Sequence, residues 1–205
     1  MRRNSALTAC FAAALSIGSA VSTADAAPGT HDGFMLQLSP GLGYYSMTAS
    51  DPTGDVTFSG TSFSLNLMMG GTLMPGVHLG GGFFLDRALS PTLEIDGNEV
   101  TGTGDFSQFP LGIGAFVDYY LDPSGGLHFQ GFFGWGGVET STPEGGAGGS
   151  DPTGAVLYLA AGYDVFVSDE VSVGGMARFA YGMFALNDVD WPTIAPALLL
   201  TLTWS

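Results

Sequence analysis

The chain has 205 residues, of which 45% are hydrophobic and 11% are charged, and it contains no Lys. Soluble domains carry charge on about a quarter of their residues, so this composition excludes an ordinary water-facing surface. Four basic residues against nineteen acidic ones give a formal net charge of −15. This charge excludes nucleic acid as a partner, because its phosphates would be repelled.

The first 26 residues have the pattern of a secretory signal peptide. An arginine pair at positions 2 and 3 precedes an apolar stretch at 6–21, and residues 24–26 read Ala-Asp-Ala, a small-x-small cleavage pattern. The arginine pair does not continue into a twin-arginine motif, and too few residues precede Cys10 for a lipoprotein signal. Cleavage after residue 26 would remove the one cysteine, so we expect neither a disulfide nor a thiolate metal site.

From residue 33 onward, eight segments alternate between large apolar side chains and small or polar ones. Successive side chains of a strand point to opposite faces, so this period of two predicts strands with one apolar face. The other face carries Gly, Ser, Thr, Asn and Gln with few ions, which suits a narrow lumen better than water. The predicted strands are residues 33–47, 58–71, 77–87, 105–121, 127–138, 155–167, 171–182 and 192–204.

Short and long connections alternate between these strands, as in up-and-down membrane barrels with tight periplasmic turns. No later stretch reaches 18 consecutive apolar residues, so we expect strands rather than a helix to cross the membrane. Residues 27–205 are therefore predicted to form one all-β domain, an eight-stranded antiparallel up-and-down transmembrane β-barrel. A soluble barrel or sandwich is the alternative. The predicted connections are 72–76, 122–126 and 168–170 (short) and 48–57, 88–104, 139–154 and 183–191 (long).

The large residues of the alternation are predicted to face lipid. Aromatic residues gather toward the strand ends, as in the girdles of membrane barrels, and we expect Phe58, Trp135 and Trp191 in the girdle at the long-loop end. The predicted lipid-facing set is Leu36, Leu38, Leu65, Leu67, Leu79, Phe83, Leu111, Ile113, Phe133, Leu159, Val173, Leu200 and Leu202.

Six ionisable residues fall on the lumen face of the predicted strands. His78, Asp118, His128 and Asp164 lie close to short turns, so neighbouring strands would bring them together at one mouth. They could ligate a divalent metal, but their spacing matches no ligand signature, and we favour a hydrogen-bonded plug without metal or cofactor.

The other two lumen residues are Asp86 and Arg178, on the third and seventh predicted strands. These strands lie on opposite sides of an eight-stranded barrel, so the long arginine side chain could cross the lumen to the carboxylate. A buried arginine without a partner would be very costly, and we therefore expect this pair to form. We interpret this pair first as a structural element of the barrel and second as a gate.

Acidic residues concentrate in and beside the long loops. Such loops could share Ca²⁺ or Mg²⁺ with anionic lipopolysaccharide, because hard cations prefer carboxylates. The alternative is plain solvated acidic loops, since no EF-hand spacing occurs. The acidic set is Asp51, Asp55, Glu94, Asp96, Glu99, Asp105, Glu139, Glu144, Asp151, Asp188 and Asp190.

The signal segment, the eight alternating strands and the last strand together resemble the OmpA/OmpX-like group, the small eight-stranded outer-membrane barrels of Gram-negative bacteria. In that strand Leu198, Leu200, Leu202 and Trp204 look like the C-terminal signal that the family's barrel assembly machinery recognises, although Ser205 follows the aromatic residue. The resemblance implies an outer-membrane location, with outer-membrane lipid, lipopolysaccharide and the assembly machinery as partners.

The expected function is that of a non-enzymatic outer-membrane barrel that contributes to envelope integrity or surface interaction. A narrow channel or carrier for a small solute is one alternative, but eight strands leave an interior about wide enough for side chains alone. A lipid-modifying enzyme is the other alternative. It would need a nucleophile and a base near the outer leaflet, and no long loop contains a histidine.

Overall fold

A computed structural model describes residues 29–51, 54–89, 91–100, 107–141, 151–187 and 189–205. The predicted signal peptide lies outside these residues and stays a prediction. None of the described residues forms a helix that is long and apolar enough to cross a bilayer.

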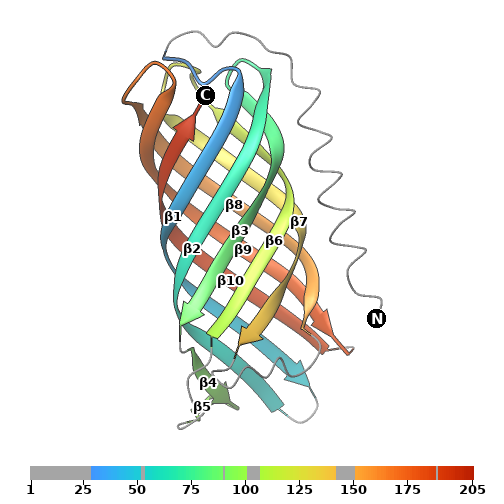
Figure 1. The fold of residues 1–205 in the computed structure, drawn as a ribbon. Coiled ribbons are helices and arrows are strands. Elements are labelled where there is room, and N and C mark those ends of the chain that lie inside the picture. The colour runs from blue at the N-terminus through green and yellow to red at the C-terminus, as the bar shows by residue number, and fades with distance from the viewer. Residues whose placement is uncertain (1–28, 52–53, 90, 101–106, 142–150, 188) are drawn as a thin grey trace.

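Eight long strands close into an antiparallel barrel (Figure 1). β1 pairs with β2 on one side and with β10 on the other, which joins the first and last strands and leaves the barrel without an open edge. This closure confirms the predicted fold class. The barrel strands are β1 (Phe34–Asp51), β2 (Gly54–Met74), β3 (Val77–Leu89), β6 (Ser107–Tyr120), β7 (Leu127–Ser141), β8 (Thr153–Phe166), β9 (Val171–Leu186) and β10 (Val189–Trp204).

Two of the predicted long loops are wrong, because strand pairing continues through them. β1 and β2 remain paired out to Asp51 and Gly54, where a loop over 48–57 was expected. Thr48 and Thr57 join across this hairpin through their hydroxyl groups, 3.0 Å apart. β9 and β10 likewise remain paired out to Leu186 and Val189, where a loop over 183–191 was expected. The physical reason is that a backbone ladder gains hydrogen bonds in water as well as in lipid, so apolar alternation marks only the membrane portion of a strand.

The predicted long loop at 88–104 contains a small hairpin of its own. β4 (Thr92–Ile95) pairs with β2 between Val56 and Ser59, and β5 (Asn98–Glu99) pairs with β4. This hairpin lies at the end of the barrel opposite to the C-terminal end of β10 (Figure 1). We call this the long-loop end, and the end that holds the three short connections the short-turn end.

The barrel exterior is apolar, as the alternation predicts. Every member of the predicted lipid-facing set is exposed or half-buried, and Leu159 and Leu200 are 64% and 70% exposed. The neighbouring positions point inward and are buried among their counterparts from other strands. One part of the girdle prediction is wrong: Trp135 is exposed on the outside, but Phe58 and Trp191 are half-buried, pack against the core and stack on each other at 6.5 Å.

The lumen accommodates large rings because small residues lie beneath them. A Cβ atom at Gly112 would come within 2.5 Å of the Phe84 ring, and one at Gly182 would clash with the ring of Phe184. These glycines are therefore needed for the packing of the rings rather than for an unusual backbone conformation.

A short strap, residues 29–33, closes the short-turn end. Its backbone bonds to the turns around the mouth: Gly29 N–H donates to Asp169 O at 3.0 Å, and His31 N–H donates to Pro123 O at 2.8 Å. The strap carries the His31 side chain into the mouth, where it is fully buried.

Candidate functional site

An ion pair crosses the lumen between β3 and β9, which lie on opposite sides of the barrel. Arg178 Nη2 donates to Asp86 Oδ1 at 2.5 Å, and Arg178 Nη1 donates to Asn66 Oδ1 at 2.6 Å. Ser64 Oγ also donates to Asp86 Oδ1, at 2.5 Å. Both charged side chains are fully buried. The structure therefore contains the predicted pair and adds two polar partners from β2.

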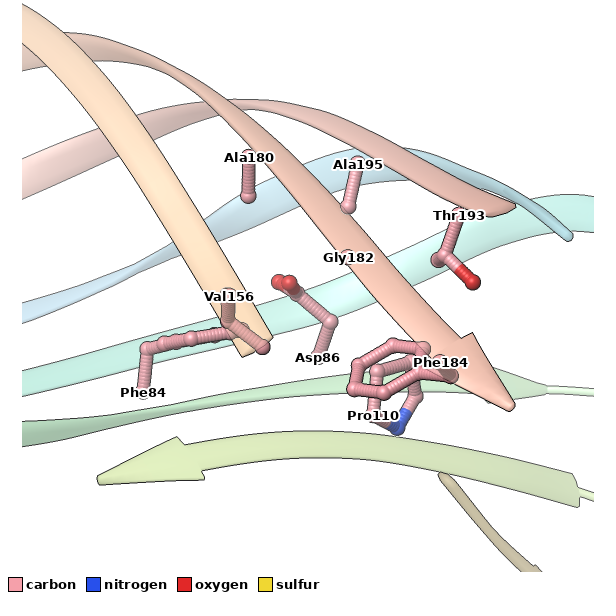
Figure 2. A pocket seen from close by; sticks show the side chains of 9 residues that line it. All are labelled: Phe84, Asp86, Pro110, Val156, Ala180, Gly182, Phe184, Thr193 and Ala195. Atoms are coloured by element: carbon pink, nitrogen blue, oxygen red, sulfur yellow. The ribbon is translucent and has the colours of Figure 1, made fainter. Parts of the chain in front are cut away.

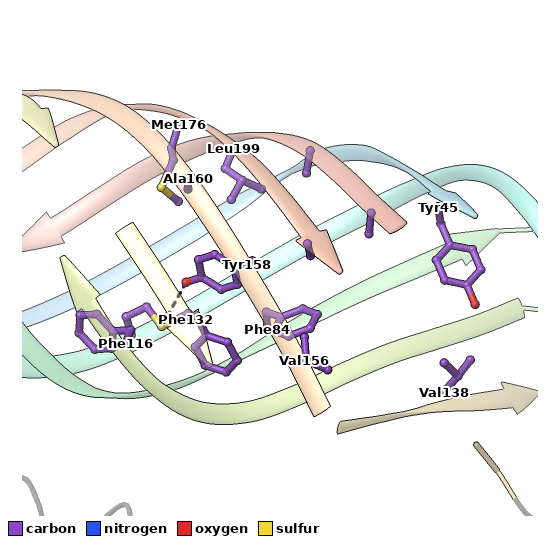
Figure 3. Packing of buried hydrophobic residues seen from close by; sticks show 14 of the residues in the cluster. Tyr45, Phe84, Phe116, Phe132, Val138, Val156, Tyr158, Ala160, Met176 and Leu199 are labelled. Carbon is purple, nitrogen blue, oxygen red and sulfur yellow. Dashed lines mark hydrogen bonds between the residues drawn. The ribbon is translucent and has the colours of Figure 1, made fainter. Parts of the chain in front are cut away.

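Aromatic rings surround this ion pair. The Arg178 guanidinium carbon lies 5.4 Å from the centroid of Phe84 and 5.9 Å from that of Tyr158, within cation–π range. Tyr158 stacks on Phe132 at 5.0 Å, and Phe84 meets Phe132 edge-on at 5.6 Å (Figure 3). The three rings form a layer, the ring layer, which fills the middle of the lumen.

A second polar cluster lies toward the short-turn end. His128 Nδ1 is 2.9 Å from Asp118 Oδ1, and His128 Nε2 is 3.9 Å from Asp164 Oδ1. Asp164 also accepts hydrogen bonds from Tyr120, at 3.2 Å, and from Thr201. All of these residues are buried. Three of the four residues predicted for this end are thus joined in one network.

The fourth residue, His78, lies beside the network without joining it. Its ring is fully buried and meets Tyr120 edge-on at 5.8 Å, and no hydrogen bond links its ring nitrogens to either carboxylate. Among the described residues, no three or more His, Cys, Asp or Glu side chains are placed to hold a metal ion.

Gln130 connects the cluster to the ring layer, and Gln37 bonds to Gln130. Tyr158 O–H donates to Gln130 Oε1 at 2.6 Å, and Gln130 Nε2 donates to Asp118 Oδ2 at 3.0 Å and to Gln37 Oε1 at 2.9 Å. Sequence reasoning missed these residues because it followed ionisable side chains only. Their signal was present, since both glutamines occupy inward positions of the alternation.

His31 completes the short-turn end from the strap. Its ring stacks on Tyr120 at 3.7 Å and lies tilted against Phe166, with ring centroids 4.4 Å apart. Burial, together with the nearby His78 and His128, lowers the pKa of His31 to about 3. This imidazole is therefore neutral at physiological pH and acts as an aromatic stopper in the mouth.

His31 also makes the contact that comes nearest to a nucleophile–base pair. Ser205 Oγ lies 3.5 Å from His31 Nδ1, and both side chains are buried. This contact lies at the short-turn end, away from the long loops, and Ser205 N–H is fixed to Glu170 O at 3.0 Å. The predicted need for a catalytic pair near the long loops is not met by this arrangement.

The surface features predicted from the sequence are placed as follows. Leu198, Leu200 and Trp204 are exposed on the outside of β10, and Leu202 is half-buried there; their role as an assembly signal stays a prediction. Of the acidic set, Asp55, Asp96, Glu99, Glu139, Asp151 and Asp190 are exposed and Glu94 is half-buried, whereas the side chains of Asp51, Asp105, Glu144 and Asp188 lie outside the described residues.

The sequence matches no protein-family model and no curated protein. Solved structures do resemble this fold. Neisserial surface protein A (NspA) has a TM-score of 0.50 and 19% identity, covering 84% of this chain and 97% of its own. OprG from Pseudomonas aeruginosa has a TM-score of 0.50 and 12% identity, covering 86% and 98%. The outer membrane protease OmpT from Escherichia coli is less similar, with a TM-score of 0.45, 9% identity and coverage of 84% and 96%.

The chain thus has the fold of the small eight-stranded outer-membrane barrels. Its apolar exterior is that of a barrel surrounded by lipid. Likeness at these identities shows the fold alone, and it does not decide between an envelope protein, a channel and an enzyme.

Proposed function

We propose that the chain is a non-enzymatic, closed outer-membrane barrel that contributes to envelope integrity or surface interaction. The observation that carries the proposal is the filling of the lumen. Four groups of side chains fill it in order from the short-turn end. They are the strap with His31, the Asp118–His128–Asp164 cluster, the ring layer and the Arg178–Asp86 pair.

The charged layers argue against the channel alternative. A solute that passed Arg178 would have to separate it from Asp86, and each would then be a buried charge without its partner. Breaking a buried ion pair in this way costs roughly 3–5 kcal/mol. The ring layer offers no alternative route, because Phe84, Phe132 and Tyr158 pack against each other there.

The positions of the histidines support the non-enzymatic assignment. A lipid-modifying enzyme needs a base that lipid or its headgroup can reach. His31, His78 and His128 are all fully buried and lie toward the short-turn end. The Ser205–His31 contact is enclosed by Tyr120 and the strap.

The long-loop end is the face proposed for envelope contact. Its exposed carboxylates include Asp55, Asp96 and Glu99 on the two neighbouring hairpins. We propose that Ca²⁺ or Mg²⁺ bridges such carboxylates to the phosphates of lipopolysaccharide, since both partners are anionic. This contact would tie the loops to the outer leaflet.

Planar-bilayer recordings test the closed barrel. The refolded mature protein should show no sustained conductance, and the Asp86→Asn/Arg178→Gln variant should remain closed because the ring layer is retained. Long-lived channel events in the unmodified protein would contradict the proposal. A gene deletion in the native host should increase sensitivity to EDTA and bile salts if the barrel supports the envelope.

A further inference from the structure

The outside of the barrel, rather than the lumen, has room for a ligand. The hollow beside Asp86 in the lumen holds roughly one water-sized group, which excludes a ligand of several heavy atoms (Figure 2). On the outside, Arg87 follows Asp86 along β3, points away from the lumen and is exposed. No other Arg or Lys of the described residues is exposed, because Arg178 is buried with Asp86. Arg87 is therefore the positive charge on an otherwise acidic surface.

Arg87 lies at the level of lipid head groups on the long-loop side of the membrane. Val77 begins β3 at the short-turn end, opposite Tyr119, an exposed aromatic residue of the kind that marks a membrane interface. Arg87 is ten residues further along β3. At a rise of about 3.3 Å per residue and a tilt of about 40°, this length spans about 25 Å along the membrane normal, the height of the apolar band of such barrels. An arginine at this boundary is placed to meet lipid phosphates.

Hydroxyl groups cover the outward face of the neighbouring strands at and above this level. Tyr44 of β1 lies opposite Thr61 of β2, and Ser46 lies opposite Ser59. Ser59 in turn lies opposite Thr92 of β4. Directly opposite residues share a face of the sheet, and the alternation turns this face outward. We call these five residues the hydroxyl panel; their strands meet at the long-loop end (Figure 1).

The hydroxyl panel is adjacent to Arg87 and is not used within the protein. Arg87 lies opposite Phe63, so Thr61, two residues further along β2, is a diagonal neighbour that a long side chain reaches. None of the panel residues makes a side-chain hydrogen bond to another described residue. By contrast, Thr48 and Thr57, the next outward pair, bond to each other. The panel hydroxyls can therefore bond to a molecule outside the barrel.

The opposite wall of the barrel lacks such a panel. β7 and β8 lie across from β1 and β2 in the strand order. The three outward pairs nearest the long-loop end of that wall are Phe133–Leu157, Trp135–Ala155 and Gly137–Thr153. Among the described residues these pairs carry one hydroxyl group, whereas the three outward pairs of β1 and β2 carry six. A general affinity for head groups would not differ between the walls, so the panel indicates a ligand bound at one place.

We propose that Arg87 and the hydroxyl panel bind the phosphorylated sugar head group of a glycolipid, the lipopolysaccharide of the outer leaflet. The Arg87 guanidinium donates two parallel N–H groups to a phosphate. The panel hydroxyls bond to the sugar, the exposed ring of Tyr44 lies against it, and Glu94, outward on β4 beside the panel, accepts from sugar hydroxyls. The inference rests on the proposed outer-membrane location and adds a direct contact to the cation bridges of the loops.

The test measures lipid binding without divalent cations. The mature protein, refolded in nonionic micelles with EDTA present throughout, is titrated with three lipids, and native mass spectrometry counts the bound molecules. The lipids are lipid A, which is the phosphorylated disaccharide that anchors lipopolysaccharide, dephosphorylated lipid A, and phosphatidylglycerol, which has the phosphate without the sugar ring. Lipid A should bind at least about tenfold more tightly than either of the others. Equal affinity for phosphatidylglycerol or for the dephosphorylated lipid would overturn the proposal.

Three variants locate the site. Arg87→Gln should weaken the binding of lipid A about tenfold, and Tyr44→Phe, which removes one panel hydroxyl, should weaken it about threefold. Tyr163→Phe makes the same change at an outward tyrosine of β8 toward the short-turn end and should leave binding unchanged. Heat-shifted migration checks that each variant is folded, since all three changes lie outside the lumen.

Unchanged binding in Arg87→Gln, or an equal loss in Tyr44→Phe and Tyr163→Phe, would also overturn the proposal. These results are independent of conductance, which tests the closed barrel. They are also independent of the cation bridges, which EDTA removes. Failure of this site and failure of the proposed function are therefore distinguishable.

Discussion

Separating Arg178 from Asp86 should reveal how strongly the barrel depends on its central ion pair. Arg178 and Ser64 are the two hydrogen-bond donors to the Asp86 carboxylate, so Arg178→Gln leaves Ser64 as the remaining donor. Asp86→Asn leaves the guanidinium with Asn66, Ser64 and the faces of Phe84 and Tyr158. Each single variant therefore retains an incompletely compensated buried charge.

The expected magnitudes follow from this residual bonding. Removing one partner of a buried pair costs roughly 3–5 kcal/mol, and Arg178→Gln should fall at the upper end since it leaves a carboxylate with one donor. Asp86→Asn should cost less, because cation–π contacts of about 0.5–2 kcal/mol remain for the arginine. The double variant leaves no unpaired charge, so it should be more stable than the sum of the singles indicates, with a coupling of about 2 kcal/mol.

The free energy of unfolding is measured for the unmodified protein, the two single variants and the double variant. Each is unfolded by urea in lipid vesicles and followed by tryptophan fluorescence and by the heat-shifted migration of folded barrels. Effects that add within about 0.3–0.5 kcal/mol would refute the reasoning, because additivity means that the two side chains do not interact. The matched control is Ser172→Ala, a buried change near the short-turn end that should show no coupling to Asp86→Asn.

Three further predictions concern the lipid face, the strap and the loops. Leu200→Arg, at an exposed position of β10, should cost roughly 2–4 kcal/mol if it lies near mid-bilayer and impair insertion, measured by the folded fraction after refolding into vesicles; Leu200→Val at the same position should insert normally. Because the pKa of His31 is lowered to about 3 in the folded protein, its contribution to stability is complete above about pH 6.5 and declines as pH falls below that value. The slope is at most about 1.4 kcal/mol per pH unit, and His31→Phe should reduce the loss in acid unfolding; an identical pH profile would contradict the assignment. EDTA should lower the thermal stability of the protein in lipopolysaccharide-containing vesicles but not in phosphatidylcholine vesicles, and equal effects in both would exclude cation bridging.

The period of two in the sequence was sufficient to predict the barrel. It identified the outward face of every strand, because one wrong step would have turned residues such as Leu159 and Leu200 into the lumen. It could not identify where the strands end. Beyond the membrane, β1, β2, β9 and β10 are held by backbone hydrogen bonds, which leave no pattern in side-chain hydrophobicity.

The sequence predicted those contacts in the lumen in which both side chains are charged. Arg178 required a counterion at the opposite wall, and Asp86 was the candidate at similar height. The neutral connections were not predictable in the same way, since Gln37, Gln130 and Asn66 have many possible partners and the register of several strands decides which one each meets. Arg178 and Ser64 both donate to Oδ1 of Asp86 and neither to Oδ2. This choice depends on the angle at which the two donors approach the carboxylate, which no sequence pattern records.

The strap has a practical consequence for labelling and display. The turn between β8 and β9 binds both the strap before β1 and the residue after β10. Asp169 O accepts a hydrogen bond from Gly29 N–H, and Glu170 O accepts one from Ser205 N–H. An epitope inserted in that turn would release both attachments at once and leave the strap held by the His31–Pro123 hydrogen bond and by its contacts with Thr72. Between β9 and β10, the described residues Asn187 and Val189 carry neither attachment. This connection is therefore the preferable site for a tag that must report on an intact barrel.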